Sequence, residues 1–136
     1  MRFPIVLAFT LAIGPAPLAA QCLDYETVTL AGTLVRQTYP GPPDYESITK
    51  GDKPVVILVL ISERPLCVVD SQSRYPRRFN EREIELALEY DQYDRYRSLL
   101  GKKVTVSGRL MNGGAKYYKQ IVLAPTAIEE TGVRPY

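Results

Sequence analysis

The side chains that most often perform acid–base chemistry near neutral pH are missing, because the 136 residues of this chain include no histidine. Without imidazole there is no Ser-His or Cys-His pair to activate a nucleophile and no base that titrates near pH 7. Carboxylate pairs do occur, at Asp44 with Glu46 and at Glu129 with Glu130. Acidic pairs in loops are typical of solvated surface, and spacing alone does not make them converge across a cleft. We therefore expect no catalytic residues, no cofactor and a protein that is not an enzyme.

Tyrosines and charged residues gather instead in two polar segments, residues 39–53 and 111–119. A tyrosine presents an apolar ring with a hydrogen-bonding tip, which suits both sugar stacking and protein interfaces. We interpret these segments as the two sides of a ligand surface, with Tyr45 and Tyr117 as its aromatic anchors. The alternative is that these two rings pack over the ends of the fold and the others are scattered surface. The predicted ligand-binding residues are Tyr39, Asp44, Tyr45, Glu46, Lys116, Tyr117 and Tyr118.

A second patch interleaves basic and aromatic residues between Arg74 and Arg82. Single-stranded nucleic-acid binders combine charge and stacking in this way. The formal net charge of the chain is only +2 at pH 7, however, and three glutamates lie close by in the sequence. A dedicated nucleic-acid binder would carry a marked excess of Lys and Arg. We therefore favour a solvated loop, with an anionic envelope component as a further ligand class.

The first twenty residues have the pattern of a secretory signal. Arg2 precedes an apolar run over residues 5–13, and small residues at positions 19–20 form a cleavage site before Gln21. The run is too short to span a membrane, which takes roughly 20 apolar residues. An N-terminal core helix and a lipid anchor on Cys22 are the alternatives. We expect residues 1–20 to be cleaved, residues 21–136 to form one domain, and the protein to be periplasmic or secreted, without a transmembrane segment.

Cys22 and Cys67 are the two cysteines of the chain, and an even number in an exported protein predicts a disulfide. Closing a loop of about 46 residues would stabilise the fold by roughly 4 kcal/mol in the chain-entropy model. Two free thiols and a metal-binding pair are the alternatives. A zinc site would lack histidine, its commonest nitrogen ligand. We expect the disulfide and no metal site.

The elements that must position these residues are mainly strands, because apolar and polar side chains alternate along much of the chain. Residues 27–34 form a half-buried strand in which Gly32 marks a bend or bulge. The continuous apolar run over residues 55–61 predicts a buried strand, and residues 62–65 predict a tight turn into a partner at 66–69. Further strands are expected over residues 84–88, 104–110 and 117–123, with a helix start as the alternative for the first of these.

A short helix is expected to begin at Asp91 as its cap and to end at Gly101. Asp91 can pair with Arg95 on its surface, one turn along. Pro125 is expected to end ordered pairing or to lie on a sheet edge. The residues that should face the core from this helix are Tyr93, Tyr96, Leu99 and Leu100.

Three strands, a short helix and two more strands match an OB-like antiparallel barrel of five to six strands. In this arrangement the strand over residues 84–88 is an insertion before the helix. In OB-folds, the loop between strands one and two and the loop between strands four and five border the binding face. In this chain these loops would be residues 39–53 and 111–119. In the same arrangement both cysteines fall at one end of the barrel. A six-stranded open β-roll with one helix is the structural alternative.

Three stretches, residues 41–48, 65–68 and 96–108, resemble an uncharacterised domain family of small exported bacterial proteins. The first reads GPPDYESI, the second PLCV and the third YRSLLGKKVTVSG. The resemblance implies no assigned activity. Members of that family carry histidines in the last hairpin, where this chain has residues 112–119 without histidine, so a metal role there does not carry over.

Together these patterns predict an exported, disulfide-bonded, non-catalytic binding module. Its ligand is expected to be an oligosaccharide or another protein of the cell envelope. The alternative is a protein inhibitor or immunity-type factor that acts through a protruding loop, for which residues 39–48 are the candidate.

Overall fold

The computed structural model describes residue 14 and residues 21–132 of the chain. The expected signal segment, residues 1–20, lies outside the described residues apart from Gly14. In the part that is described, no helix is both long and apolar enough to cross a membrane.

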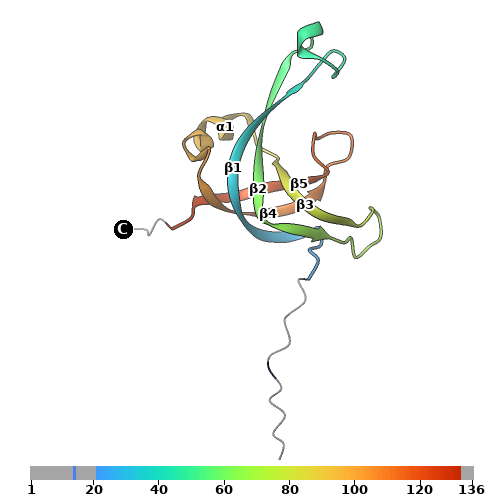
Figure 1. Cartoon of the computed structure of the whole chain (residues 1–136), viewed down its shortest axis with the longest axis vertical. Helices are drawn as coiled ribbons and strands as arrows, with labels where there is room; N and C mark the ends of the chain where they lie inside the picture. The colour runs from blue at the N-terminus through green and yellow to red at the C-terminus, as the bar shows by residue number, and fades with distance from the viewer. Residues whose placement is uncertain (1–13, 15–20, 133–136) are drawn as a thin grey trace, which may run out of the picture.

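Five strands close into a barrel in the order β1-β2-β3-β5-β4 (Figure 1). The pairs β1–β2, β2–β3 and β4–β5 are antiparallel, and β1 closes the ring by pairing antiparallel with β4. The expected mainly β structure with one short helix is confirmed. The strands are β1 (Thr27–Pro40), β2 (Pro54–Val68), β3 (Arg78–Leu86), β4 (Lys103–Asn112) and β5 (Ile121–Glu130).

The expectation that all strands run antiparallel is wrong, because β3 and β5 pair in parallel over residues 84–86. A closed ring of five strands cannot alternate its direction all the way round, so at least one neighbouring pair must be parallel. In this barrel β5 lies between β3 and β4, and its pairing with β3 is the parallel one. The segment that connects β3 to β4 carries the helix.

The second strand is longer than predicted and contains no hairpin turn at residues 62–65. β2 continues to Val68, and its pairing with β3 shifts register between Ile61 and Leu66. A bulge of this kind lets a strand bend and accommodate a proline without ending. The real turn follows at residues 69–77, so the strand around Ile84 is the third barrel strand and not an insertion, and residues 66–69 are not a strand of their own.

The last strand begins later than predicted, at Ile121, and runs through Pro125. Beyond Leu123, β5 pairs with β4 but no longer with β3, so one of its edges can accept a residue without an N–H group. The register with β4 shifts next to Pro125, between Ser107 and Gly108. Residues 117–120 therefore belong to the preceding loop.

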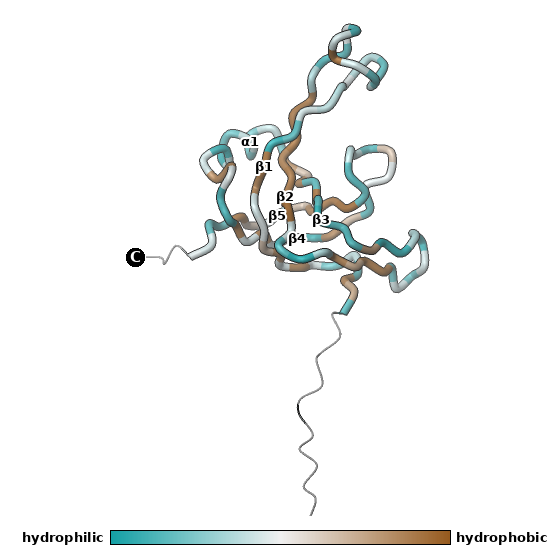
Figure 2. The backbone as a smooth tube through the Cα atoms, viewed as in Figure 1, coloured by the Kyte–Doolittle hydropathy of each residue, from teal (hydrophilic) through white to brown (hydrophobic). Residues whose placement is uncertain are grey.

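The core fills the barrel with branched aliphatic side chains. Buried side chains alternate with more exposed ones along β1 and β4, whereas β2, β3 and β5 each contain a run of at least three consecutive buried residues. In Figure 2 the hydrophobic stretches follow the barrel strands, whereas the projecting end of the β1–β2 hairpin is mostly hydrophilic. Gly32 pairs with both Ser62 of β2 and Val104 of β4, and a Cβ atom there would collide with the carbonyl of Ile61. The fully buried side chains include Leu34, Leu60, Ile84, Leu86, Val104, Val106, Leu110, Ile121 and Leu123.

The helix α1 (Tyr90–Tyr96) continues into a 3-10 turn, η2 (Arg97–Leu99), and closes one end of the barrel. Its cap is Glu89 and not the predicted Asp91, because the Gln92 side chain accepts a hydrogen bond from the Glu89 N–H at 2.7 Å. The predicted Asp91–Arg95 ion pair forms at 3.5 Å. The four predicted inward residues, Tyr93, Tyr96, Leu99 and Leu100, pack against the core as expected.

The N-terminal segment is held against the end of β2 by covalent and backbone bonds. Cys22 forms a disulfide with Cys67, and the described residues contain no free cysteine. Leu23 forms a parallel bridge with Val68, donating its N–H to the carbonyl of Cys67 and accepting one from Val69. The predicted disulfide is confirmed.

Candidate functional site

The β1–β2 hairpin extends well beyond the barrel and forms a projecting arm, residues 35–58 (Figure 1). Past Thr33, β1 no longer pairs with β4, and before Val59, β2 does not yet pair with β3. The two strands of the arm therefore pair only with each other. The predicted loop of residues 39–53 lies at the tip, where the 3-10 turn η1 (Ile48–Lys50) is found.

The buried carboxylate of Asp52 organises the tip of the arm. It accepts hydrogen bonds from the backbone N–H groups of Asp44, Glu46 and Ser47 at 3.0, 2.7 and 2.8 Å. These bonds, that from Ser47 most of all, lower the pKa of Asp52. Asp44 and Glu46, both predicted ligand residues, thus shape the tip through their backbone and expose their side chains to solvent.

The loop between β4 and β5, residues 113–120, folds back over the outer face of the sheet, and we call it the covering loop. Glu85 lies on this face, because it falls between the core residues Ile84 and Leu86. It is only 5% exposed, and one of its oxygens accepts the backbone N–H groups of Tyr118 and Lys119 at 2.7 and 2.9 Å. This buried carboxylate fixes the covering loop to β3.

Two predicted site residues, Tyr39 and Tyr118, are brought together between the arm and the covering loop. Their rings stack at 4.9 Å between centroids, and the Tyr118 hydroxyl donates to the carbonyl of Pro40 at 3.1 Å. The Lys119 ammonium donates to the Tyr39 hydroxyl at 2.7 Å and to Glu83 at 3.1 Å. These polar groups bond to each other, so the pair fastens the arm to the covering loop.

The other predicted aromatic and basic residues lie outside this cluster, each in a different place. Tyr45 is 61% exposed at the tip of the arm, with a left-handed backbone at φ 58°. Tyr117 is half-buried and lies close enough to Tyr93 of α1 to help raise its pKa. The exposed Lys116 places its ammonium 5.5 Å from the centre of the Tyr117 ring.

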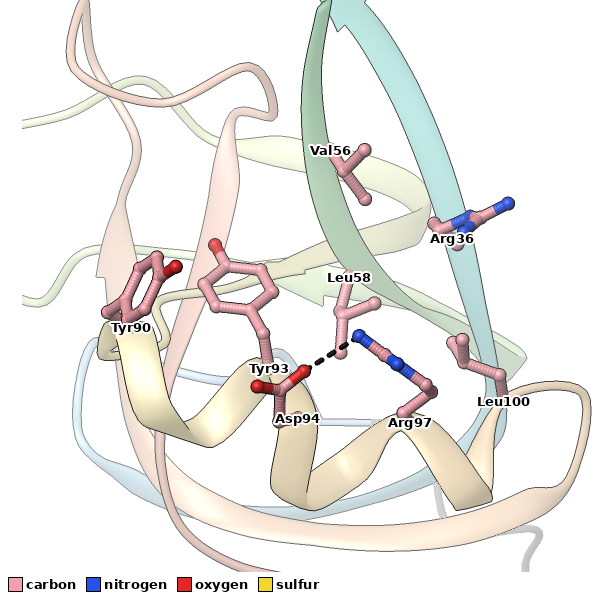
Figure 3. A pocket seen from close by; sticks show the side chains of 8 residues that line it. All are labelled: Arg36, Val56, Leu58, Tyr90, Tyr93, Asp94, Arg97 and Leu100. Atoms are coloured by element: carbon pink, nitrogen blue, oxygen red, sulfur yellow. Dashed lines mark hydrogen bonds and ion pairs between the residues drawn. The ribbon is translucent and has the colours of Figure 1, made fainter.

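A pocket of about 490 Å³ lies on the other side of the arm, between the arm and α1 (Figure 3). This volume is within the usual range of small-molecule sites. Leu58 forms a buried floor, while Tyr90 and Tyr93 stand up from the helix. Tyr90 is 93% exposed, which is unusual for so large an aromatic side chain. The lining residues are Arg36, Val56, Leu58, Tyr90, Tyr93, Asp94, Arg97 and Leu100.

The pocket combines aromatic rings with hydrogen-bonding groups of both charges. Asp94 and Arg97 form an exposed ion pair at 2.7 Å. The pKa of the Tyr93 hydroxyl is raised, first by burial and then by the nearby Glu85 carboxylate and Tyr117. A tyrosine hydroxyl, with an ordinary pKa of about 10, is protonated at neutral pH and can donate a hydrogen bond. Such a site can stack a ring and bind its polar substituents, but it contains no strong base.

None of the pocket residues was predicted as a ligand residue from the sequence. The signal was present in the helix, where Tyr90, Tyr93, Asp94 and Arg97 follow the spacing of one helical face. Tyr93 was assigned to the core, which is correct but incomplete, because its ring also borders the pocket. No sequence pattern indicates that Arg36 and Val56 line a pocket, because they lie opposite the helix only through the projection of the hairpin.

The basic segment, residues 74–82, lies in the β2–β3 turn and the start of β3, and none of its residues lines the pocket. Arg74 pairs with the fully buried carboxylate of Asp70 at 3.2 Å, and this contact lowers the pKa of Asp70. Tyr75 packs edge-on against Tyr25 at 5.5 Å. Part of this segment thus has a structural role in the β2–β3 turn, whereas Phe79 remains 60% exposed.

The described residues contain no group of three or more acidic, cysteine or histidine side chains placed to hold a metal ion.

The chain matches the model of a family described as a domain of unknown function (DUF4431) over residues 83–114. The match begins in β3, includes α1 and extends through β4 to the start of the covering loop. It contains the third of the three stretches on which the family resemblance rests, and so confirms the resemblance to an uncharacterised domain family. No curated protein matches the chain.

Proposed function

We propose that the protein is an exported, non-catalytic binding module with an OB-like barrel, and that the pocket between the arm and α1 binds an oligosaccharide. The pocket carries this proposal, because it places two tyrosines, a carboxylate and two guanidinium groups around an apolar floor. The flat rings can stack on the C–H face of a sugar ring, while the polar groups bond its hydroxyls.

The fold supports the class of binding module, whereas the choice of the pocket rests on its lining, because no lining residue comes from the arm tip or the covering loop. The ring of five strands, with its helix between β3 and β4, agrees with an OB-like barrel, whose ligands bind near the loops between strands one and two and between strands four and five. In this chain those loops are the arm tip and the covering loop. The disulfide between Cys22 and Cys67 favours an oxidising compartment, the periplasm or the cell exterior.

A glycan array, followed by calorimetry with each glycan that binds, tests the proposal. We expect Tyr90→Ala to weaken binding by about 1 kcal/mol or more and to leave the melting temperature nearly unchanged. Phe79→Ala is the matched control, since it also removes an exposed aromatic ring and Phe79 does not line the pocket. Equal affinities of Tyr90→Ala and wild type would move the site elsewhere, and the absence of any glycan binding would refute the proposal.

The predicted anchors Tyr45 and Tyr117 are tested in the same assay. An anchor should weaken binding when changed to alanine while the melting temperature stays unchanged. If Tyr117→Ala lowers the melting temperature and leaves the affinity intact, the residue is a packing residue beside Tyr93 and not an anchor.

Inhibition of a partner protein through the arm is the second candidate function. It is favoured by the tip of the arm, where the Asp52 hydrogen bonds preorganise a protruding loop with Tyr45 and Ile48 exposed at 61% and 42%. Rigid loops lose little entropy on binding. In a pull-down from envelope extract, wild type should capture a partner of the tip. The Tyr45→Ala, Ile48→Ala double variant should not capture it. Capture that persists with the double variant excludes the tip as the interface.

The non-catalytic part of the proposal is tested by metal analysis and by product analysis with each bound glycan. We expect no stoichiometric zinc or copper after exhaustive dialysis against chelator, and no cleavage of the glycan. Retained stoichiometric metal or turnover of the glycan would refute it.

A further inference from the structure

We infer that the ligand of the pocket is an acidic saccharide, and that Arg36 recognises its carboxylate. This inference rests on the proposed oligosaccharide function and names the class of sugar. The inference is drawn from the positive charge of Arg36, which no carboxylate of the pocket lining pairs with.

The two guanidinium groups of the pocket differ in their partners. Arg97 is neutralised by Asp94 at 2.7 Å. Arg36, on the arm, makes no ion pair or side-chain hydrogen bond within the described part of the chain. The lining therefore keeps one unpaired positive charge, which favours an anionic group on the ligand.

The position of Arg36 fits recognition of a carboxylate at one end of a sugar. Figure 3 shows Arg36 on the arm at one end of the pocket, exposed and with its guanidinium directed outward at the rim, and Tyr90 at the other end, with the floor residue Leu58 between them. A guanidinium offers parallel N–H donors that match the two oxygens of a carboxylate. A uronic acid joins this carboxylate to a ring with an apolar face, which can lie over Leu58 and against Tyr93.

The two halves of the lining would thus act on different parts of one ligand. Arg36 would bind the carboxylate, while Asp94 accepts hydrogen bonds from ring hydroxyls that a simple anion lacks. Phosphate or chloride would satisfy Arg36 but would leave the tyrosines and the apolar floor without contacts. The combination points to an acidic sugar and not to a small inorganic anion.

Calorimetric titration with an oligogalacturonate, a neutral galactose oligosaccharide of the same length and polyglutamate tests the inference. We expect the uronate to bind at least about tenfold more tightly than the neutral sugar at low ionic strength. Arg36→Gln should remove this preference, so that the uronate and the neutral sugar bind with similar affinity. Arg109→Gln, an exposed arginine on β4, is the matched control and should keep the preference.

The outcomes separate this inference from the proposed function. Equal affinity for both sugars, or a uronate preference that survives in Arg36→Gln, overturns the role of Arg36 while oligosaccharide binding stands. Polyglutamate binding as tight as that of the uronate shows recognition of charge alone and overturns the acidic sugar. Binding of neither sugar overturns the inference, and the proposed function then depends on whether the glycan array finds another sugar.

Discussion

Three buried carboxylates, Asp52, Asp70 and Glu85, hold three of the connections between strands. Asp52 accepts backbone N–H groups at the arm tip, Asp70 those of Gln72 and Arg74 in the β2–β3 turn, and Glu85 those of the covering loop. A buried charged group is costly unless it is hydrogen-bonded, so each carboxylate stabilises only one loop conformation. The acidic residues that look like ligands, Asp44 and Glu46, are by contrast exposed.

The stability that Asp52 contributes should depend on pH. Its pKa is lowered in the folded protein by backbone hydrogen bonds, so the ionised form favours folding. The contribution is complete above the unfolded value, about 3.9, and is lost as the pH falls through the lower folded value. We expect Asp52→Asn to melt below wild type at pH 7 and the gap to close toward pH 2–3. Asp44→Asn, exposed on the same loop, should melt like wild type at both pH values.

Removing the side chain of Glu85 should destabilise the protein clearly. Glu85→Ala leaves the N–H groups of Tyr118 and Lys119 without their acceptor, which costs about 1–3 kcal/mol for a buried donor. Urea denaturation should report this loss. Glu63→Ala, on an exposed glutamate of β2, should stay within about 0.5 kcal/mol of wild type. Equal midpoints for the two variants would show that the covering loop is held by other contacts.

At the scale of elements, the β1–β2 hairpin contributes to both the barrel and the arm. Its base belongs to the barrel and buries Leu34 and Leu60. In the arm the two strands pair only with each other and form one wall of the pocket. The exchange of partners occurs at Gly32, where β1 touches β2 and β4 at once. The position of the pocket therefore depends on how the arm leaves the barrel.

Gly32→Ala should be among the most damaging single substitutions in the strands. Its Cβ would meet the backbone carbonyl of Ile61, which cannot move without breaking the barrel ladder. We expect a loss of about 2 kcal/mol or more, or failure to fold. Ala31→Thr, at the neighbouring exposed position, should be neutral in the same thermal melts. A Gly32→Ala protein as stable as wild type would mean that the two strands separate easily at this point.

At the scale of the whole molecule, the barrel closes because β1 pairs with a strand that follows it by more than sixty residues. The disulfide adds a second long-range constraint by joining Cys22 to Cys67 across 45 residues of sequence. The bond lies beside the Leu23–Val68 bridge, at the same end as the β2–β3 turn. It therefore holds an N-terminal segment that the barrel ladder does not include.

Breaking the disulfide should lower stability without changing the fold. The chain-entropy model gives a loss of about 4 kcal/mol, because the bond chiefly restricts the unfolded chain. The Cys22→Ser, Cys67→Ser variant should keep the far-ultraviolet circular dichroism of wild type and melt at a lower temperature. Mass spectrometry of the non-reduced protein should find no alkylatable thiol, and two alkylated cysteines would contradict the structure.

Local patterns in the sequence were sufficient to locate most of the strands, the helix and much of the core, but not the extent of β2 or the start of β5. Alternation at residues 27–34 and 104–110 reports which face is buried, because side chains in a strand point to opposite faces in turn. The helical spacing of Tyr93, Tyr96 and Leu100 similarly identified the face that packs on the barrel. The disulfide was predicted from the two cysteines of the chain, since two thiols can pair in only one way.

Only the tertiary structure decided where strands bend, which neighbours pair in parallel and where the pocket lies. Pro65 reads as a turn signal, yet the bulge against β3 absorbs it, and a local pattern contains no information on a partner strand. The parallel pairing of β3 with β5 follows from closing an odd number of strands. The pocket needs Arg36 from β1 opposite Tyr90 from α1, more than fifty residues later in the sequence, so its existence depends on the three-dimensional path of the arm.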